Sequence, residues 1–171
     1  MSGPLDSYMD SVRSSQELDF KQPISCTQPE HAVEIYKLFF RKAKGEILMY
    51  QNLFQGDVFV DVEFIREMER AVYRNVNFEL IAQRPDEGSE FFERLEMLQA
   101  RTPFAHYFEI PKNTQSNRIN PRSFLVVDSK AFRLENKDGE AIAYFNNPNI
   151  ARQLTERFVS IRRKLEGIRS I

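Results

Sequence analysis

Helix-type and strand-type patterns alternate along the first two thirds of this chain, and this alternation limits its fold more than any other feature. Apolar residues recur at helical spacing in 29–44, 61–75 and 89–101, and a short apolar run follows each segment. Strands that alternate with helices form layered structures, because each helix must cover a face of the sheet. We therefore expect one α/β domain over 26–171, with helices on both faces of a mixed sheet.

Helix ends carry local signals. Thr27 is expected to cap the first helix, with Glu30 completing a capping box, and Gly45 is expected to end it. The last helix has the clearest signature, with Asn147 as its cap and Pro148 at its first position. Its apolar residues form a continuous stripe that must dock on a sheet: Ile150, Leu154, Phe158, Ile161, Leu165 and Ile168.

Composition limits the cellular location of the protein and the classes of partner that it can bind. Residues 1–25 are rich in Ser, Asp and Gln, which is typical of a flexible arm, either disordered or loosely docked, and the apolar residues of SYMDSV suit a short helix. The single cysteine, Cys26, permits no disulfide within the chain and favours a reducing, cytoplasmic location. No apolar run approaches the roughly 18 residues that span a bilayer, so no membrane role is expected. The net charge of -1 excludes a whole-chain signature for nucleic acid, so such a role would need a local patch.

The stretch NPRSFLVVDSKAFRLE, residues 120–135, has a short apolar run that ends in Asp128. Its SFLVVD resembles the K-F-(apolar)3-D core of the phospholipase D motif, H-x-K-x-x-x-x-D. The upstream strand–helix–strand segment that begins EILMYQNLF and the closing YFNNPNIARQLTERF are also similar to that family. The resemblance covers roughly residues 28–165. It implies a phospholipase D-like fold.

The chain differs from the family at two of the motif positions that carry out the reaction. In the family, the motif His attacks phosphorus, the Lys binds the phosphate charge and the Asp supports the reaction. Counting back from Asp128, Pro121 stands in the His position and Ser123 in the Lys position. Proline offers no nucleophile, and serine offers no positive charge for the developing anion. We therefore expect no catalytic residue, no enzyme activity, and neither a cofactor nor a bound metal.

The loop before this strand is the strongest candidate for binding. Residues 112–122 contain Lys112, Arg118 and Arg122 and no acidic residue. Arginine binds phosphate or carboxylate in a bidentate manner, although an ordinary polar surface loop would have a similar composition. By the resemblance, this loop borders the phosphate pocket of the fold. The predicted ligand-binding residues are Arg118, Asn120, Arg122 and Ser123 as donors, with Asp128 and Lys130 organising the turn.

Three hypotheses follow. The leading one is a catalytically inactive phospholipase D-like domain that binds an anionic, phosphate-bearing ligand or a protein partner, with a homodimer implied by the resemblance. The second is a nucleic-acid-binding accessory protein that uses loop 112–122 and the basic C-terminal helix, with salt-sensitive affinity. The third is a phosphodiesterase or nuclease with an unrecognised site. The chain has only two histidines, His31 and His106, and structural roles are expected for both.

Overall fold

The computed structural model describes residues 3–17, 23–51, 57–85, 88–112, 122–136 and 140–169. Within them the strands are β1 (Ile24–Cys26), β2 (Glu46–Gln51), β3 (Asn77–Ala82), β4 (Ala105–Glu109), β5 (Phe124–Val127), β6 (Ala131–Glu135) and β7 (Ala141–Tyr144). They form one mixed sheet in the order β1-β7-β6-β5-β2-β3-β4. Strands β2, β3 and β4 run parallel, and β5 joins β2 in antiparallel fashion. The remaining pairs are also antiparallel.

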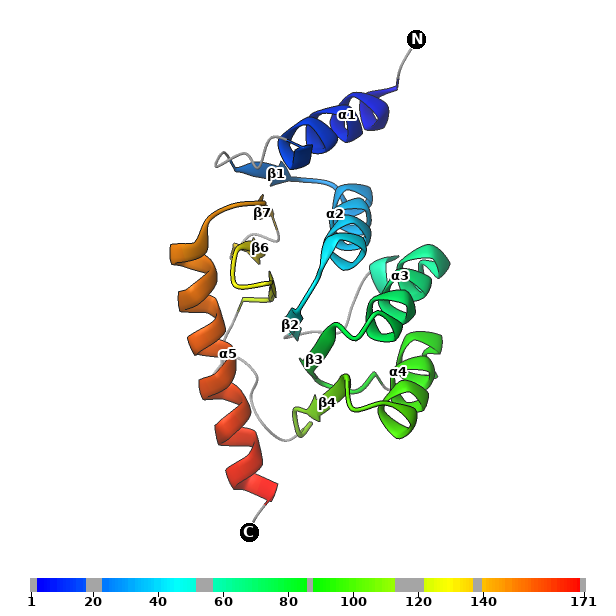
Figure 1. The fold of residues 1–171 in the computed structure, drawn as a ribbon, viewed down its shortest axis with the longest axis vertical. Coiled ribbons are helices and arrows are strands. Elements are labelled where there is room, and N and C mark those ends of the chain that lie inside the picture. The colour runs from blue at the N-terminus through cyan, green and yellow to red at the C-terminus, as the bar shows by residue number, and fades with distance from the viewer. Residues whose placement is uncertain are drawn as a thin grey trace.

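Helices cover both faces of this sheet (Figure 1). They are α1 (Pro4–Glu17), α2 (Pro29–Lys42), α3 (Val62–Tyr73), α4 (Glu90–Arg101) and α5 (Pro148–Arg169), with a short 3-10 turn, η1 (Asp57–Val60). The side chains of α2, α3 and α4 pack with one face of the sheet, and α5 packs with the other. The predicted mixed sheet with two helical layers is confirmed. None of the described helices is both long and apolar enough to cross a membrane.

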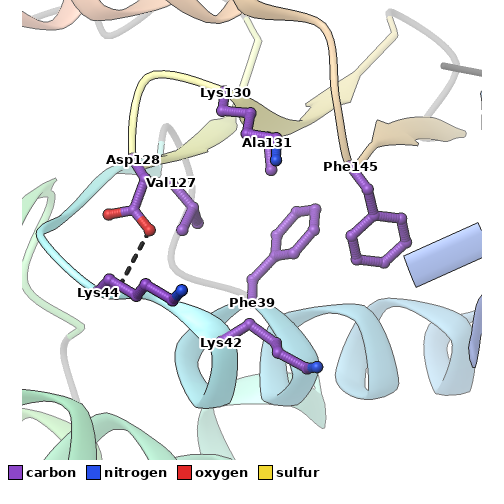
Figure 2. Close-up of a pocket in the computed structure, with 8 residues that line it drawn as sticks. All are labelled: Phe39, Lys42, Lys44, Val127, Asp128, Lys130, Ala131 and Phe145. Carbon is purple, nitrogen blue, oxygen red and sulfur yellow. Dashed lines mark hydrogen bonds between the residues drawn. The ribbon is translucent and has the colours of Figure 1, made fainter. Parts of the chain in front are cut away.

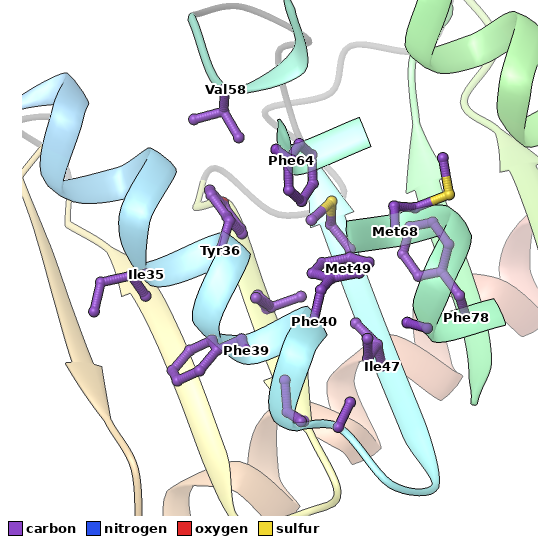
Figure 3. Packing of buried hydrophobic residues seen from close by; sticks show 14 of the residues in the cluster. Ile35, Tyr36, Phe39, Phe40, Ile47, Met49, Val58, Phe64, Met68 and Phe78 are labelled. Atoms are coloured by element: carbon purple, nitrogen blue, oxygen red, sulfur yellow. The ribbon is translucent and has the colours of Figure 1, made fainter. Parts of the chain in front are cut away.

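The larger core layer is rich in aromatic rings (Figure 3). Phe40 of α2 meets Phe64 of α3 edge to face, with ring centroids 5.1 Å apart, and meets Phe78 of β3 at 5.2 Å. Such offset contacts add to the burial of apolar surface. Helices α2 and α3 are thereby fixed against the parallel half of the sheet.

The predicted helix caps are partly right. Asn147 Oδ1 accepts the Ile150 N–H at 3.3 Å, so the cap of α5 is confirmed. The cap predicted for the first helix is wrong, because α2 has Gln28 at its N-cap and no side-chain cap bond. Pro29, which lacks an N–H group, begins this helix directly. Ala43 rather than Gly45 ends it.

The flexible arm predicted for residues 1–25 is wrong where the structure describes it, whereas the short helix that SYMDSV suits is present within α1. Val12 of α1 is fully buried in the larger core layer. Tyr8 of the same helix stacks on His31, with ring centroids 3.7 Å apart. Strand β1 begins before residue 25 and pairs with β7 through Ile24 and Ala143. Polar composition misled the prediction because a few apolar residues on one face suffice to dock a short helix.

Candidate functional site

The loop between β5 and β6 has three residues, Asp128 to Lys130, because Val127 pairs with Ala131 across the hairpin. Asp128 and Ser129 both have a φ of 51°, in the left-handed region. The Lys130 N–H donates to the Val127 carbonyl at 3.0 Å and closes the turn. Positive φ at both central residues is the hairpin geometry that matches strand twist, and aspartate tolerates it better than most residues. The motif aspartate therefore lies at the tip of a hairpin.

The Asp128 carboxylate binds the main chain of a distant turn. Its Oδ1 accepts the N–H groups of Gly45 at 2.8 Å and Glu46 at 2.9 Å. Its Oδ2 accepts the Lys44 N–H at 3.0 Å. The Asp128 N–H in turn donates to the Glu46 carbonyl at 2.9 Å. This residue therefore joins the β5–β6 hairpin to the turn between α2 and β2, more than eighty residues earlier in the chain.

The residues predicted as one ligand site do not lie together. Arg122 and Ser123 precede the first residue of β5, whereas Asp128 and Lys130 follow its last residue. At about 3.3 Å per residue, Ser123 and Asp128 are roughly 16 Å apart, beyond opposite ends of the central strand β5. One phosphate-sized ligand cannot contact both groups. Arg118 and Asn120 lie outside the described residues, as does Pro121.

A cavity of about 510 Å³ lies beside the Asp128 end of β5 (Figure 2). Its volume is within the range of small-molecule sites. Three segments contribute to it: the end of α2 with the turn that follows, the β5–β6 hairpin, and the start of the β7–α5 connection. Its lining residues are Phe39, Lys42, Lys44, Val127, Asp128, Lys130, Ala131 and Phe145. We call it the lysine pocket.

The lysine pocket combines an apolar wall with a positive rim. The Phe39 and Phe145 rings meet edge to face, with centroids 5.2 Å apart. Lys42 and Lys44 are exposed and form no ion pair within the described part of the chain. Three lysines and one aspartate line the cavity, and the aspartate carboxylate is already bound by main-chain N–H groups. This arrangement suits an anion.

Sequence reasoning found only Asp128 and Lys130 of this pocket. The other lining residues come from segments far away in the chain, and no local pattern links them. One weak signal existed, because Lys42 and Lys44 cluster at the end of a helix with an apolar face. Cations at a helix C-terminus also complement the macrodipole, so the pattern alone does not indicate a site.

A second polar cluster lies between the sheet and α5. The Arg162 guanidinium contacts Glu79 Oε2 at 2.6 Å, and Asn77 Nδ2 donates to Glu79 Oε1 at 3.1 Å. Burial raises the pKa of the Glu46 carboxyl, and the nearby carboxylates of Glu79 and Asp128 raise it further. Within the described residues, no group of three or more His, Cys, Asp or Glu side chains is placed to hold a metal ion.

Solved structures share this arrangement of sheet and helices. Nuc from Salmonella typhimurium, a phospholipase D family member, is 14% identical with a TM-score of 0.60, covering 84% of this chain and 96% of that chain. NucT from Helicobacter pylori is 10% identical with a TM-score of 0.59, covering 82% and 94%. TrmBL2, an archaeal chromatin protein with a novel mode of DNA binding, is 15% identical with a TM-score of 0.59.

The TrmBL2 match covers 94% of this chain and 62% of the longer TrmBL2 chain. No protein-family model matches the sequence, and a search of curated proteins finds no match. At these low identities the likeness establishes the fold and nothing further. The predicted phospholipase D-like fold is confirmed.

The Asp128 contacts predict that replacing one carboxylate oxygen lowers the stability of the folded protein. Asp128→Asn keeps the left-handed turn but turns one acceptor oxygen into a donor that faces the Lys44 N–H. Because Asp128 is exposed, we expect a loss of about 0.5–1.5 kcal/mol in the free energy of unfolding, measured by urea denaturation. Asp10→Asn, at an exposed position on α1, is the matched control and should change stability by less than about 0.5 kcal/mol. Equal stability of the two variants would contradict the structural role of Asp128.

The raised pKa of Glu46 predicts a pH-dependent gain in stability for Glu46→Gln. Because the folded protein disfavours the charged carboxylate, ionisation costs stability as pH rises through the raised folded pKa. The variant should therefore be more stable than the parent at neutral pH, and the gain should vanish below the ordinary carboxyl range. Thermal melts from pH 3 to pH 8 measure it, with exposed Glu140→Gln as the control. A gain that persists unchanged in acid would contradict the assignment.

Proposed function

We propose that this chain is a non-catalytic phospholipase D-like domain that binds a phosphate-bearing anionic ligand. One observation carries the proposal. Three lysines surround a cavity of about 510 Å³, and the acid among its lining residues, Asp128, already accepts three main-chain N–H groups. Ammonium groups near a partly apolar cavity attract an anion more strongly than they would in open water. Binding, rather than turnover, is the activity that this arrangement favours.

The placement of the other candidate groups supports the absence of catalysis. Ser123, in the position of the family's Lys, is 4% exposed and has no charge to offer. His31 stacks on Tyr8 at the start of α2, and His106 lies on the edge strand β4 opposite Glu79. Neither histidine lines the lysine pocket.

Anion binding is tested with inorganic phosphate and pyrophosphate on the full chain by isothermal titration calorimetry. The double variant Lys42→Gln/Lys44→Gln should weaken binding at least about tenfold, because removal of a charge-assisted contact costs on the order of 1.5–3 kcal/mol. The control Arg152→Gln/Arg163→Gln removes the same charge from the outer face of α5 and should leave phosphate binding unchanged. Equal affinities of the parent and the lysine variant would overturn the proposal.

The same preparation also tests the absence of catalysis. It is assayed for hydrolysis of bis(p-nitrophenyl) phosphate, and no turnover is expected. Turnover that disappears in His106→Gln would show an enzyme and would contradict the non-catalytic part of the proposal. Asp128→Asn is unsuited to this assay because it loosens the fold itself.

A nucleic-acid partner is the second candidate, and the outer face of α5 favours it. Arg152, Arg157, Arg163 and Lys164 are exposed and form no ion pair within the described residues. At about 1.5 Å per residue they span roughly 18 Å of helix, long enough to follow several phosphates of a duplex. The structural neighbour TrmBL2 binds DNA. A homodimer, by contrast, is proposed from the family resemblance alone, and sedimentation equilibrium measures it.

Duplex DNA binding should depend on α5 and not on the lysine pocket. Fluorescence anisotropy with a labelled duplex should show an affinity that falls steeply between 50 and 200 mM salt. Arg152→Gln/Arg163→Gln should lower the affinity and flatten the salt slope by about two, while Lys42→Gln/Lys44→Gln should match the parent. Absence of binding by the parent at low salt would eliminate this candidate.

A further inference from the structure

We infer that the outer edge of β4 pairs with the same edge of a second copy of this chain, in antiparallel register about Tyr107. This goes beyond the homodimer proposed above, which names no surface, and it shares no residue with the lysine pocket. Strand β4 ends the sheet on the side opposite β1 (Figure 1). It has five residues, whereas the other edge strand, β1, has three.

The hydrogen bonds between β3 and β4 establish which main-chain groups of β4 face inward. The Phe104 carbonyl accepts the Phe78 N–H at 2.8 Å, and the Ile110 N–H donates to the Ala82 carbonyl at 2.9 Å. The two strands pair in parallel without a break between these points. Because main-chain groups alternate in direction along a strand, the even-numbered residues of β4 bind β3.

The odd-numbered residues of β4 therefore turn their main-chain groups outward. These residues are Ala105, Tyr107 and Glu109, and no hydrogen bond to their N–H or C=O groups occurs among the described residues. Such a row of donors and acceptors is a template for another strand. If two copies pair about Tyr107, Tyr107 bonds with its own counterpart and Ala105 bonds with Glu109 of the second copy. Every outward group then has a partner.

Two prolines limit the register of any strand that pairs with this edge. Pro103 and Pro111 lie at equal distances before and after Tyr107, and neither has an N–H group to donate. Pairing about Tyr107 sets Pro103 of one copy against Pro111 of the other. A shift by two residues would instead set a proline against Ala105 or Glu109 and leave a carbonyl without its donor. The prolines therefore favour the self-paired register.

The segment between these prolines lacks the features that protect edge strands from pairing. Its sequence, FAHYFEI, contains no lysine and no proline, and the register with β3 shows no bulge. Natural proteins use those features to prevent contact between sheet edges. Their absence between two flanking prolines is consistent with an edge that admits one partner in one register.

The side chains that would face each other suit this register. Glu109 of one copy stands opposite Ala105 of the other, so no like charges meet along the strand. His106 stands opposite Phe108, and ring pairs across strands are favourable. His106, Phe108 and Glu109 are all half-buried in the single chain, so each has surface left to cover.

The helices next to β4 lie on its two faces and not across its edge. The Phe92 ring of α4 meets the Tyr107 ring, with centroids 5.0 Å apart. On the other face, the Arg162 guanidinium of α5 lies over the Phe108 ring, 5.9 Å from its centroid. Both contacts use side chains, so the main-chain groups at the edge stay available. The two sheets would join into one continuous sheet.

The first test is sedimentation equilibrium of the full chain from micromolar to millimolar concentration. A weak dimer is expected, because the pairing of one short strand buries less surface than a standard interface. Glu109→Pro removes an outward N–H group from each copy, and an edge strand tolerates proline where its N–H faces solvent. The dissociation constant should rise at least about fivefold, since two main-chain hydrogen bonds are lost in each dimer.

Glu109→Ala is the matched control. It removes the carboxylate, which contacts Arg84 at 3.9 Å, but keeps the main-chain N–H group. Its dissociation constant should stay within about twofold of the parent, because an exposed ion pair contributes little. A thermal melt verifies that both variants fold.

Amide exchange of the parent chain, measured by NMR, tests the register without any variant. The amides of Ala105, Tyr107 and Glu109 should exchange more slowly at high than at low protein concentration, because their hydrogen bonds form only in the dimer. The amide of Phe108, which faces β3, should be protected at both concentrations and serves as the internal reference.

Three results would overturn this inference. The parent chain could remain monomeric at millimolar concentration. A dimer could form equally well in the parent and in Glu109→Pro, which would place the interface elsewhere. The exchange of the Tyr107 and Glu109 amides could be independent of concentration while a dimer forms. None of these results bears on phosphate binding, which the lysine variants test separately.

Discussion

The carboxylate of Asp128 is the contact on which the rest of this structure depends. It accepts three N–H groups from the turn between α2 and β2, and its own N–H donates to that turn. Hydrogen bonds to a charged acceptor are stronger than neutral ones, and three of them converge here on one side chain. The contact fixes how β5 enters the centre of the sheet beside β2. It also brings Lys44 and Lys130, which are far apart in the chain, to the same cavity.

In the proposed function, this contact gives Asp128 a physical reason to be present without catalysis. Ser123 and Asp128 stand at opposite ends of a four-residue strand, so the end that would hold the reacting groups can change while the other end keeps its structural role. In the proposed function, binding takes place beside the Asp128 end instead.

Element order and type could be predicted because they depend on local signals. The stripe of α5 and its Asn147 cap lie within one contiguous segment. The two wrong predictions, the flexible arm and the end of the first helix at Gly45, have a common cause. Tyr8 and Val12 dock α1 through partners that lie elsewhere in the chain. Gly45 serves the distant Asp128 carboxylate rather than the end of its own helix.

The sequence by itself determined the α/β class, the mixed sheet and the likeness to phospholipase D, whereas the departure at Pro121 and Ser123 stays a prediction. These follow from periodicity, caps and motif spacing, all of which act over a few residues. Only the tertiary structure decided that Asp128 binds the main chain of a distant turn and that Phe39 and Phe145 meet beside the lysines. It also showed that the described residues of the predicted site divide between the two ends of β5. The physical reason is that the residues of a site come from segments far apart in the chain, and the pairing of the strands determines which of these segments lie close together.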